Sequence, residues 1–123
     1  MPKTTIAPLV LVADDSAELR EIYAEALRDA GLRVELATDG VDAVEKALAL
    51  LPDVIVIDLE MPRLDGLAAA RRLKQDPRTS GVPVILSTSL PVKDEAELAG
   101  CAFLEKPCRL DALVAAVRAQ LPP

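Results

Sequence analysis

Short runs of aliphatic residues alternate along this chain with stretches in which apolar residues recur every three or four positions. The runs, which we expect to be strands, cover residues 8–13, 33–37, 53–57, 82–87 and 103–105. Each run is followed by a stretch with helical spacing. Such alternation is typical of β-α-β units and predicts an α/β domain built on a parallel sheet.

Four of the helical stretches have a clear apolar face, and two of them also have residues that mark where the helix begins and ends. Ser16 is placed to cap the first, which Gly31 ends, and Thr38 or Asp39 can cap the second, which Pro52 stops. The predicted apolar faces are Leu19, Ile22, Tyr23, Ala26, Leu27 and Ala30; Val41, Val44, Leu48 and Leu51; Leu67, Ala70 and Leu73 within residues 66–74; and Leu110, Leu113, Val114 and Val117 within residues 110–121.

The run at residues 53–57 reads DVIVI and is almost uninterrupted in β-branched residues. This composition predicts a central strand covered on both faces. The region between the fourth and fifth runs is weaker, because Pro91 prevents a continuous helix and only residues 94–99 show helical spacing. We therefore expect a fourth helix that is shortened or irregular.

Length and composition limit the possibilities further. A chain of 123 residues fits one compact domain, with about residues 8–121 structured, and its apolar residues are mostly Ala, Val, Leu and Ile.

The formal charge of −6 argues against direct DNA binding, and neither a membrane-spanning run nor a signal peptide is visible. We expect a cytoplasmic protein. Without any His, Cys101 and Cys108 are interpreted as free thiols rather than metal ligands.

Candidate chemistry gathers at the ends of the predicted strands. Asp14 and Asp15 follow the first strand, Asp58 the third, Thr88 the fourth and Lys106 the fifth. Because ligands of open parallel sheets bind beyond the carboxyl ends of the strands, these side chains are expected at one rim. Taken singly, each residue has an ordinary explanation, such as a helix cap. Separate caps do not explain why such residues follow four different strands at the same end of the sheet. Clustered carboxylates need a cation, and Mg²⁺ suits such oxygen ligands and phosphoryl transfer.

The same residues carry a family resemblance. Asp14-Asp15, the stretch DLEMPRLDG at 58–66, PVILST at 83–88 and Lys106-Pro107 occur in order and together resemble the signatures of response-regulator receiver domains, including chemotaxis regulators. The resemblance spans nearly the whole chain. It implies a flavodoxin-like, three-layer α/β fold with a five-stranded parallel sheet in the order 2-1-3-4-5 and helices on both faces.

The resemblance also implies roles for individual residues. Asp58 would accept a phosphoryl group from a sensor histidine kinase or a histidine phosphotransfer protein, with Lys106 holding a phosphoryl oxygen next to a cis peptide bond. Asp15, Asp58 and the backbone carbonyl of Glu60 would bind Mg²⁺, and Asp14 would act through a water or from just outside the direct ligands. Thr88 and Phe103 would form a switch read by a downstream protein target.

This reading makes the chain a signalling domain of a two-component system or phosphorelay, catalysing only its own phosphotransfer and dephosphorylation. Either a complete regulator or part of a longer chain is compatible with it. One alternative is a receiver-like module that binds a partner without phosphorylation, although no acceptor, metal ligand or Lys is lost. Another is a metal-dependent phosphatase, which the lack of an Asp two residues after Asp58 disfavours.

Only 17 residues separate Thr88 from Lys106, fewer than in most receivers, and the shortage falls on the fourth helix. In many receivers that helix belongs to the output face. We therefore hypothesise a modified output surface, in which residues 89–102 become ordered on phosphorylation or partner binding.

Overall fold

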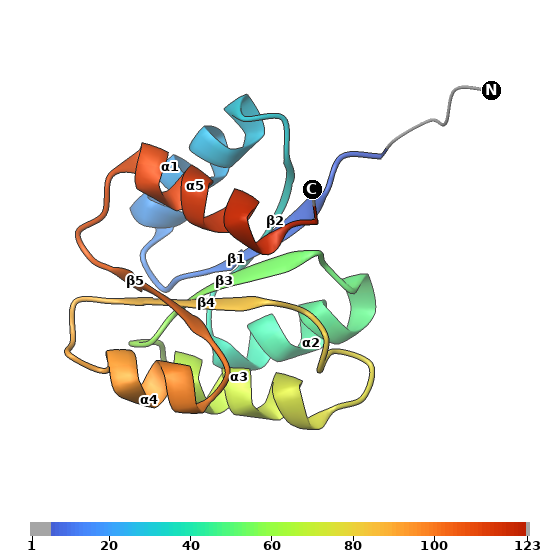
Figure 1. Cartoon of the computed structure of the whole chain (residues 1–123), viewed down its shortest axis with the longest axis vertical. Coiled ribbons are helices and arrows are strands. Elements are labelled where there is room, and N and C mark those ends of the chain that lie inside the picture. Colours follow the sequence, from blue (N-terminus) through green and yellow to red (C-terminus); the bar gives the residue numbers. More distant parts are fainter. Residues whose placement is uncertain (1–5, 123) are drawn as a thin grey trace.

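A computed structural model of the chain describes residues 6–122, and it confirms a five-stranded, all-parallel sheet in the order β2-β1-β3-β4-β5. Helices alternate with the strands throughout (Figure 1). The strands are β1 (Leu9–Ala13), β2 (Arg33–Ala37), β3 (Val54–Asp58), β4 (Val84–Thr88) and β5 (Ala102–Glu105), and the helices are α1 (Ala17–Asp29), α2 (Gly40–Leu50), α3 (Gly66–Gln75), α4 (Lys93–Leu98) and α5 (Leu110–Gln120).

The sheet is the middle of three layers. Helices α1 and α5 cover one face, whereas α2, α3 and α4 cover the other (Figure 1). Successive residues of β3 point to opposite faces, so Ile55 and Ile57 join the core under α2 and α3 while Val54 and Val56 join the core under α1 and α5. All five residues of β3 are buried and β3 is the middle strand of the sheet, which confirms the prediction of a central strand covered on both faces.

Capping side chains define where three of the helices begin. The Ser16 hydroxyl accepts a hydrogen bond from the Leu19 amide at 3.2 Å. Asp39, rather than Thr38, caps α2 by accepting from the Asp42 amide at 2.8 Å, and Asp65 caps α3 by accepting from the Ala68 amide at 2.8 Å. The capping residues lie in the loops that follow β1, β2 and β3, so each cap fixes the point where its loop ends and its helix begins.

Three residues placed on apolar helix faces by their spacing are exposed instead. Leu51 ends α2 in a left-handed conformation with φ 48°, which turns its side chain out of the helical stripe, and it is 54% exposed. Ile22 and Leu110 are 37% and 42% exposed. The buried face of each of these two helices is narrower than the apolar face that the residue spacing predicts. In α1 the buried face is centred on Tyr23 and Leu27, and in α5 Leu110 is the first residue of the helix.

The fourth strand also differs from its predicted range. It begins at Val84 rather than Val82 and ends at Thr88 rather than Ser87, so Thr88 is the last residue of the strand instead of the first residue beyond it. Pairing of Thr88 with Glu105 of β5 accounts for the extension at this end. Thr88 is fully buried as a result.

The prediction of a shortened fourth helix is confirmed. Helix α4 has six residues, begins after Val92 without a side-chain cap and buries only Ala96, while Leu98 is 88% exposed. Both cysteines are free thiols, as expected. Within residues 6–122, no helix is both long and apolar enough to cross a bilayer.

Candidate functional site

Three carboxylates meet at the carboxyl ends of β1 and β3. The parallel register aligns Ala13 with Ile57, so Asp14 and Asp58 emerge side by side at the sheet edge. Each of Asp14, Asp15 and Asp58 offers a carboxylate oxygen, and these oxygens lie within 4.8 Å of one another. Asp14 and Asp58 are buried, whereas Asp15 is exposed. The juxtaposition expected from the strand ends is therefore present.

Lys106 brings a positive charge into this cluster from the end of β5. Its Nζ lies 2.8 Å from Asp14 Oδ2 and 3.4 Å from Asp58 Oδ1, although 92 residues separate it from Asp14 in the chain. The Lys106 amide also donates to the Thr88 carbonyl at 3.0 Å, which ties the strand end to β4. The Lys106–Pro107 peptide bond is cis, as the resemblance implied.

Burial and charge set the protonation of the acceptor candidate. Burial raises the pKa of Asp58 to about 6, and the Asp14 carboxylate adds to this rise while Lys106 and the Glu60 amide oppose it. Burial alone would lower the pKa of Lys106, but its hydrogen bond to Asp14 and the charges of Asp14 and Asp58 raise it overall. At neutral pH the cluster therefore carries more negative than positive charge.

The two switch candidates lie on the neighbouring strands. Thr88 Oγ1 accepts a hydrogen bond from the Leu90 amide at 3.1 Å, which holds the start of the β4–α4 loop. Phe103 is half-buried against the core under α2, α3 and α4, and it pairs in register with Leu86 of β4. The structure thus places the hydroxyl at the rim and the ring on the side of the shortened helix.

Glu60 lies in the loop that follows Asp58. Its side chain is exposed, and its amide donates to Asp58 Oδ1 at 3.4 Å. The loop approaches the strand end closely at Gly66, where an added Cβ would lie 2.2 Å from the Asp58 carbonyl oxygen. Glycine is therefore needed for this loop to fold back over the sheet edge.

The donor set fits a hard divalent cation. It offers carboxylate oxygens, which Mg²⁺ prefers, and contains no sulfur or imidazole group among the converging side chains. Two of the carboxylates are buried against the single ammonium group of Lys106, and the raised pKa of Asp58 reflects both that burial and the nearby Asp14 charge. A cation at this edge would offset the excess negative charge.

Comparison with known proteins places this geometry in a family. The family model described as response regulator receiver domain matches residues 10–118, which include every converging residue named above. This chain belongs to the response-regulator receiver domains. It is thus a receiver domain of the kind used in two-component systems, in which an acidic site binds Mg²⁺.

Individual relatives agree with this membership. The chain is 33% identical over 118 residues to the DNA-binding dual master transcriptional regulator RpaA of Synechocystis, covering 93% of this chain and 49% of RpaA. The chemotaxis response regulator CheY4 of Vibrio cholerae superposes with a TM-score of 0.88 at 28% identity, over 94% of this chain and all of CheY4. The receiver domain therefore spans about half the length of RpaA.

A third relative is informative about the acidic cluster. The receiver domain of the sensor histidine kinase PA1611 from Pseudomonas aeruginosa superposes with a TM-score of 0.85 at 28% identity, over 94% of this chain and 98% of the other. That structure has a magnesium ion coordinated in its active-site cleft.

Several polar residues of the receiver domain contact the site or its loops without having been expected there. The Arg20 Nη1 donates to the Asp14 carbonyl at 2.6 Å, and the Tyr23 hydroxyl lies 3.5 Å from Cys108 Sγ. Burial, followed by the contact with Cys108, raises the pKa of Tyr23. Arg20 could have been suspected, because it lies one turn into α1 and therefore near the same rim.

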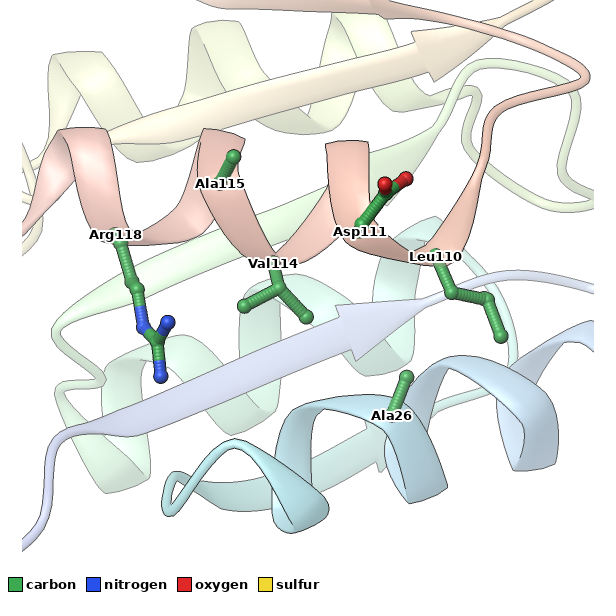
Figure 2. A pocket seen from close by; sticks show the side chains of 6 residues that line it. All are labelled: Ala26, Leu110, Asp111, Val114, Ala115 and Arg118. Carbon is green, nitrogen blue, oxygen red and sulfur yellow. The ribbon is translucent and has the colours of Figure 1, made fainter.

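Apolar surface continues from the rim along the seam between α1 and α5. Ile22 and Leu110, whose exposure differed from expectation, border a hollow beside Lys106, and Leu110 also borders a second, more open groove. Figure 2 shows this second groove, with Val114 and Leu110 of α5 pointing toward Ala26 of α1. The hollow is lined by Leu19, Ile22, Tyr23, Ser89, Lys106, Pro107, Cys108 and Leu110, and the groove by Ala26, Leu110, Asp111, Val114, Ala115 and Arg118.

Proposed function

We propose that Asp58 accepts a phosphoryl group from a phosphohistidine on a sensor histidine kinase or phosphotransfer protein, with Mg²⁺ as cofactor. The observation that carries this proposal is the convergence of Asp14, Asp15 and Asp58 with Lys106 at one strand edge. We assign Asp58 as the acceptor because it ends the central strand, its carboxylate lies within 4.8 Å of the other two, and it is 3.4 Å from the Lys106 ammonium group. A carboxylate that only capped a helix would need neither the other carboxylates nor the ammonium group beside it.

The transfer is a displacement at phosphorus. A carboxylate oxygen of Asp58 attacks the phosphorus atom, the bond from the histidine nitrogen to phosphorus breaks, and the electron pair leaves with the imidazole. The product is an acyl phosphate. With a pKa of about 6, Asp58 is mostly ionised at pH 7 and is therefore a competent nucleophile, and its burial keeps it poorly hydrated.

Groups around Asp58 would stabilise the negative charge of the transferred phosphoryl group. Asp15, Asp58 and the Glu60 carbonyl would bind Mg²⁺, with Asp14 acting through a water, and the bound cation supplies neutralising charge for the phosphoryl oxygens. Lys106 is anchored by Asp14, and its Nζ is already 3.4 Å from Asp58 Oδ1. It can therefore donate to a phosphoryl oxygen on Asp58 with little movement.

Readout would pass through Thr88 and Phe103. A phosphoryl group on Asp58 offers the Thr88 hydroxyl a stronger acceptor, and rotation toward it would release the Leu90 amide that Oγ1 now holds. Phe103 would then fill space beside the β4–α4 loop. NMR with the phosphate mimic beryllofluoride tests this switch: it requires shifts at both Thr88 and Phe103, and unchanged resonances would exclude it.

The message would be delivered to a protein target rather than to DNA. Net charge is −6, and α4, the shortest helix among the described residues, exposes three acidic residues, Asp94, Glu95 and Glu97, beside Leu98 and the single basic residue Lys93. An acidic surface with one exposed Leu suits a basic, partly apolar protein partner. The receiver domain would signal through such an output surface.

Acetyl phosphate and Mg²⁺ provide the direct test of the acceptor role. Intact-mass spectrometry should show one phosphoryl group per chain, lost in Asp58→Ala and in the presence of EDTA. Asp111→Asn is the matched control, because Asp111 is an exposed carboxylate of α5 that pairs with Arg109 away from the acidic cluster, and it should accept the label normally.

The same incubation separates the competing functions. A phosphorylation-independent binding module would take no label with an intact fold. A phosphatase would turn over small phosphoesters many times without accumulating one phosphoryl group per chain. Either result would refute the role of Asp58 as a stable phosphoryl acceptor.

A further inference from the structure

The loop between β3 and α3, residues 59–65, is fastened to the start of α2 by an ion pair outside the acidic cluster. Arg63 Nε lies 2.8 Å from Asp39 Oδ2, and Arg63 Nη2 lies 3.0 Å from Asp39 Oδ1. Both carboxylate oxygens are thus engaged by one guanidinium in a bidentate pair, the geometry that fixes orientation best. Asp39 is itself held, because Oδ1 also accepts from the Asp42 amide.

The backbone of the same loop presses against the residue next to Asp39. A Cβ added at Gly40 would lie 1.8 Å from the Leu64 carbonyl oxygen, so the loop occupies the space that any side chain there would need. Within the loop, the Leu64 amide donates to the Pro62 carbonyl and the Gly66 amide to the Leu59 carbonyl, both at 2.8 Å. The loop is therefore a compact unit docked on two consecutive residues, Asp39 and Gly40.

Arg63 adopts an unfavourable backbone conformation to make this contact. Its φ is 66°, in the left-handed region that favours Gly or Asn. A residue with a long side chain is held there although a smaller one would suit the backbone better. The side chain is 59% exposed, so core packing does not explain its place, and within residues 6–122 its polar contact is the bidentate pair with Asp39.

We propose that Arg63 is a positioning residue for the metal site: by clamping the loop to Asp39, it presets the Glu60 carbonyl that would bind Mg²⁺. This inference rests on the proposed function. Glu60 lies three residues before Arg63 in the docked loop, and its amide already contacts Asp58. A loosened loop would leave the carboxylates in place but remove a preset oxygen donor, so the cation would bind more weakly.

Mg²⁺ titration of the metal-free protein, followed by NMR at the Glu60 and Met61 amides, measures this role without any phosphotransfer. Arg63→Ala should raise the midpoint by about tenfold. Asp39→Asn should do the same, because Asn still caps α2 but lacks the charge. Hydrogen exchange at the Leu64 and Gly66 amides should accelerate in both variants before any metal is added.

Two further variants control for trivial effects. Arg78 makes a bidentate pair with Asp76 of the same kind, at 3.1 and 2.8 Å, but in the α3–β4 loop at the other end of the sheet. Arg78→Ala should leave the Mg²⁺ midpoint unchanged. Arg63→Gly relieves the left-handed φ while removing the ion pair, and it should weaken Mg²⁺ binding as Arg63→Ala does.

The outcomes are distinct from those that test the acceptor. An Arg63→Ala midpoint equal to that of Arg78→Ala, or full recovery of wild-type binding in Arg63→Gly, would overturn the role of the ion pair. A wild-type protein that binds Mg²⁺ but takes no phosphoryl group would instead refute the proposed function, while the titration would still decide what Arg63 does. Folding of each variant is checked from the dispersion of the same spectra.

Discussion

Replacing Asp58 by Asn should stabilise the metal-free protein, although Asp58 is the proposed acceptor. Burial raises its pKa from the ordinary 3.8 to about 6, and one pKa unit corresponds to about 1.4 kcal/mol. Ionising Asp58 at pH 7 therefore costs the folded state about 3 kcal/mol relative to the unfolded chain. The neutral amide of the variant would avoid this cost, which already includes the attraction of Lys106, so we expect a gain of about 1–3 kcal/mol.

The sign of the pH dependence follows from the raised pKa. Below pH 4 the carboxyl becomes protonated in both states and the two proteins should differ little. Between about pH 4 and 6 the unfolded chain releases its proton first, so the wild-type free energy of unfolding falls and the gain in Asp58→Asn grows, reaching a plateau near pH 7. Saturating Mg²⁺ should favour the wild type instead.

Urea unfolding followed by circular dichroism, in EDTA at several pH values, measures this difference. Asp76→Asn is the control, because Arg78 lowers the pKa of Asp76 and neutralising that carboxyl should bring no gain. An Asp58→Asn protein no more stable than the wild type at pH 7, or a gain independent of pH between about 4 and 6, would refute the electrostatic account of the site.

Three other predictions concern the fold that presents the site. Gly66→Ala should destabilise the protein by about 3 kcal/mol in urea unfolding, since its Cβ would meet the Asp58 carbonyl oxygen at 2.2 Å, and an unchanged midpoint would contradict that contact. Leu113→Ala, in the core under α5, should cost about 2–5 kcal/mol, whereas Leu98→Ala on the exposed side of α4 should stay within about 0.5 kcal/mol. Amides of residues 89–102 should exchange faster than those of β3 and slow on phosphorylation; equal protection in both states would exclude ordering of that segment.

Much of this arrangement could be predicted from the sequence because strand ends determine it. Five aliphatic runs separated by helical stretches specify a parallel sheet, and such a sheet brings residues at its strand ends to one edge. Asp14, Asp58 and Lys106 meet for that reason. The short α4 was also predictable, since Pro91 and the number of residues before Lys106 leave little room for a helix.

Other features depend on tertiary contacts that periodicity does not encode. Ile22 and Leu110 have helical spacing like their buried neighbours, but the seam between α1 and α5 leaves them exposed. The ion pair of Arg63 with Asp39 joins residues 24 apart, and although Asp39 could be recognised as a helix cap, nothing in the sequence indicates that it pairs with Arg63. Only the docking of one loop on the neighbouring helix brings them together, and the left-handed φ of Arg63 is a consequence of that docking.

Borohydride trapping tests directly whether Asp58 itself carries the phosphoryl group. Reduction of the phosphorylated protein with borohydride converts an acyl phosphate into an alcohol, so peptide mapping by mass spectrometry can locate the modified side chain. We predict that residue 58 is converted to homoserine only after incubation with a phosphodonor and Mg²⁺. Conversion at Asp14, Asp15 or any other carboxylate instead, or at none of them, would contradict the assignment of Asp58 as the phosphoryl acceptor.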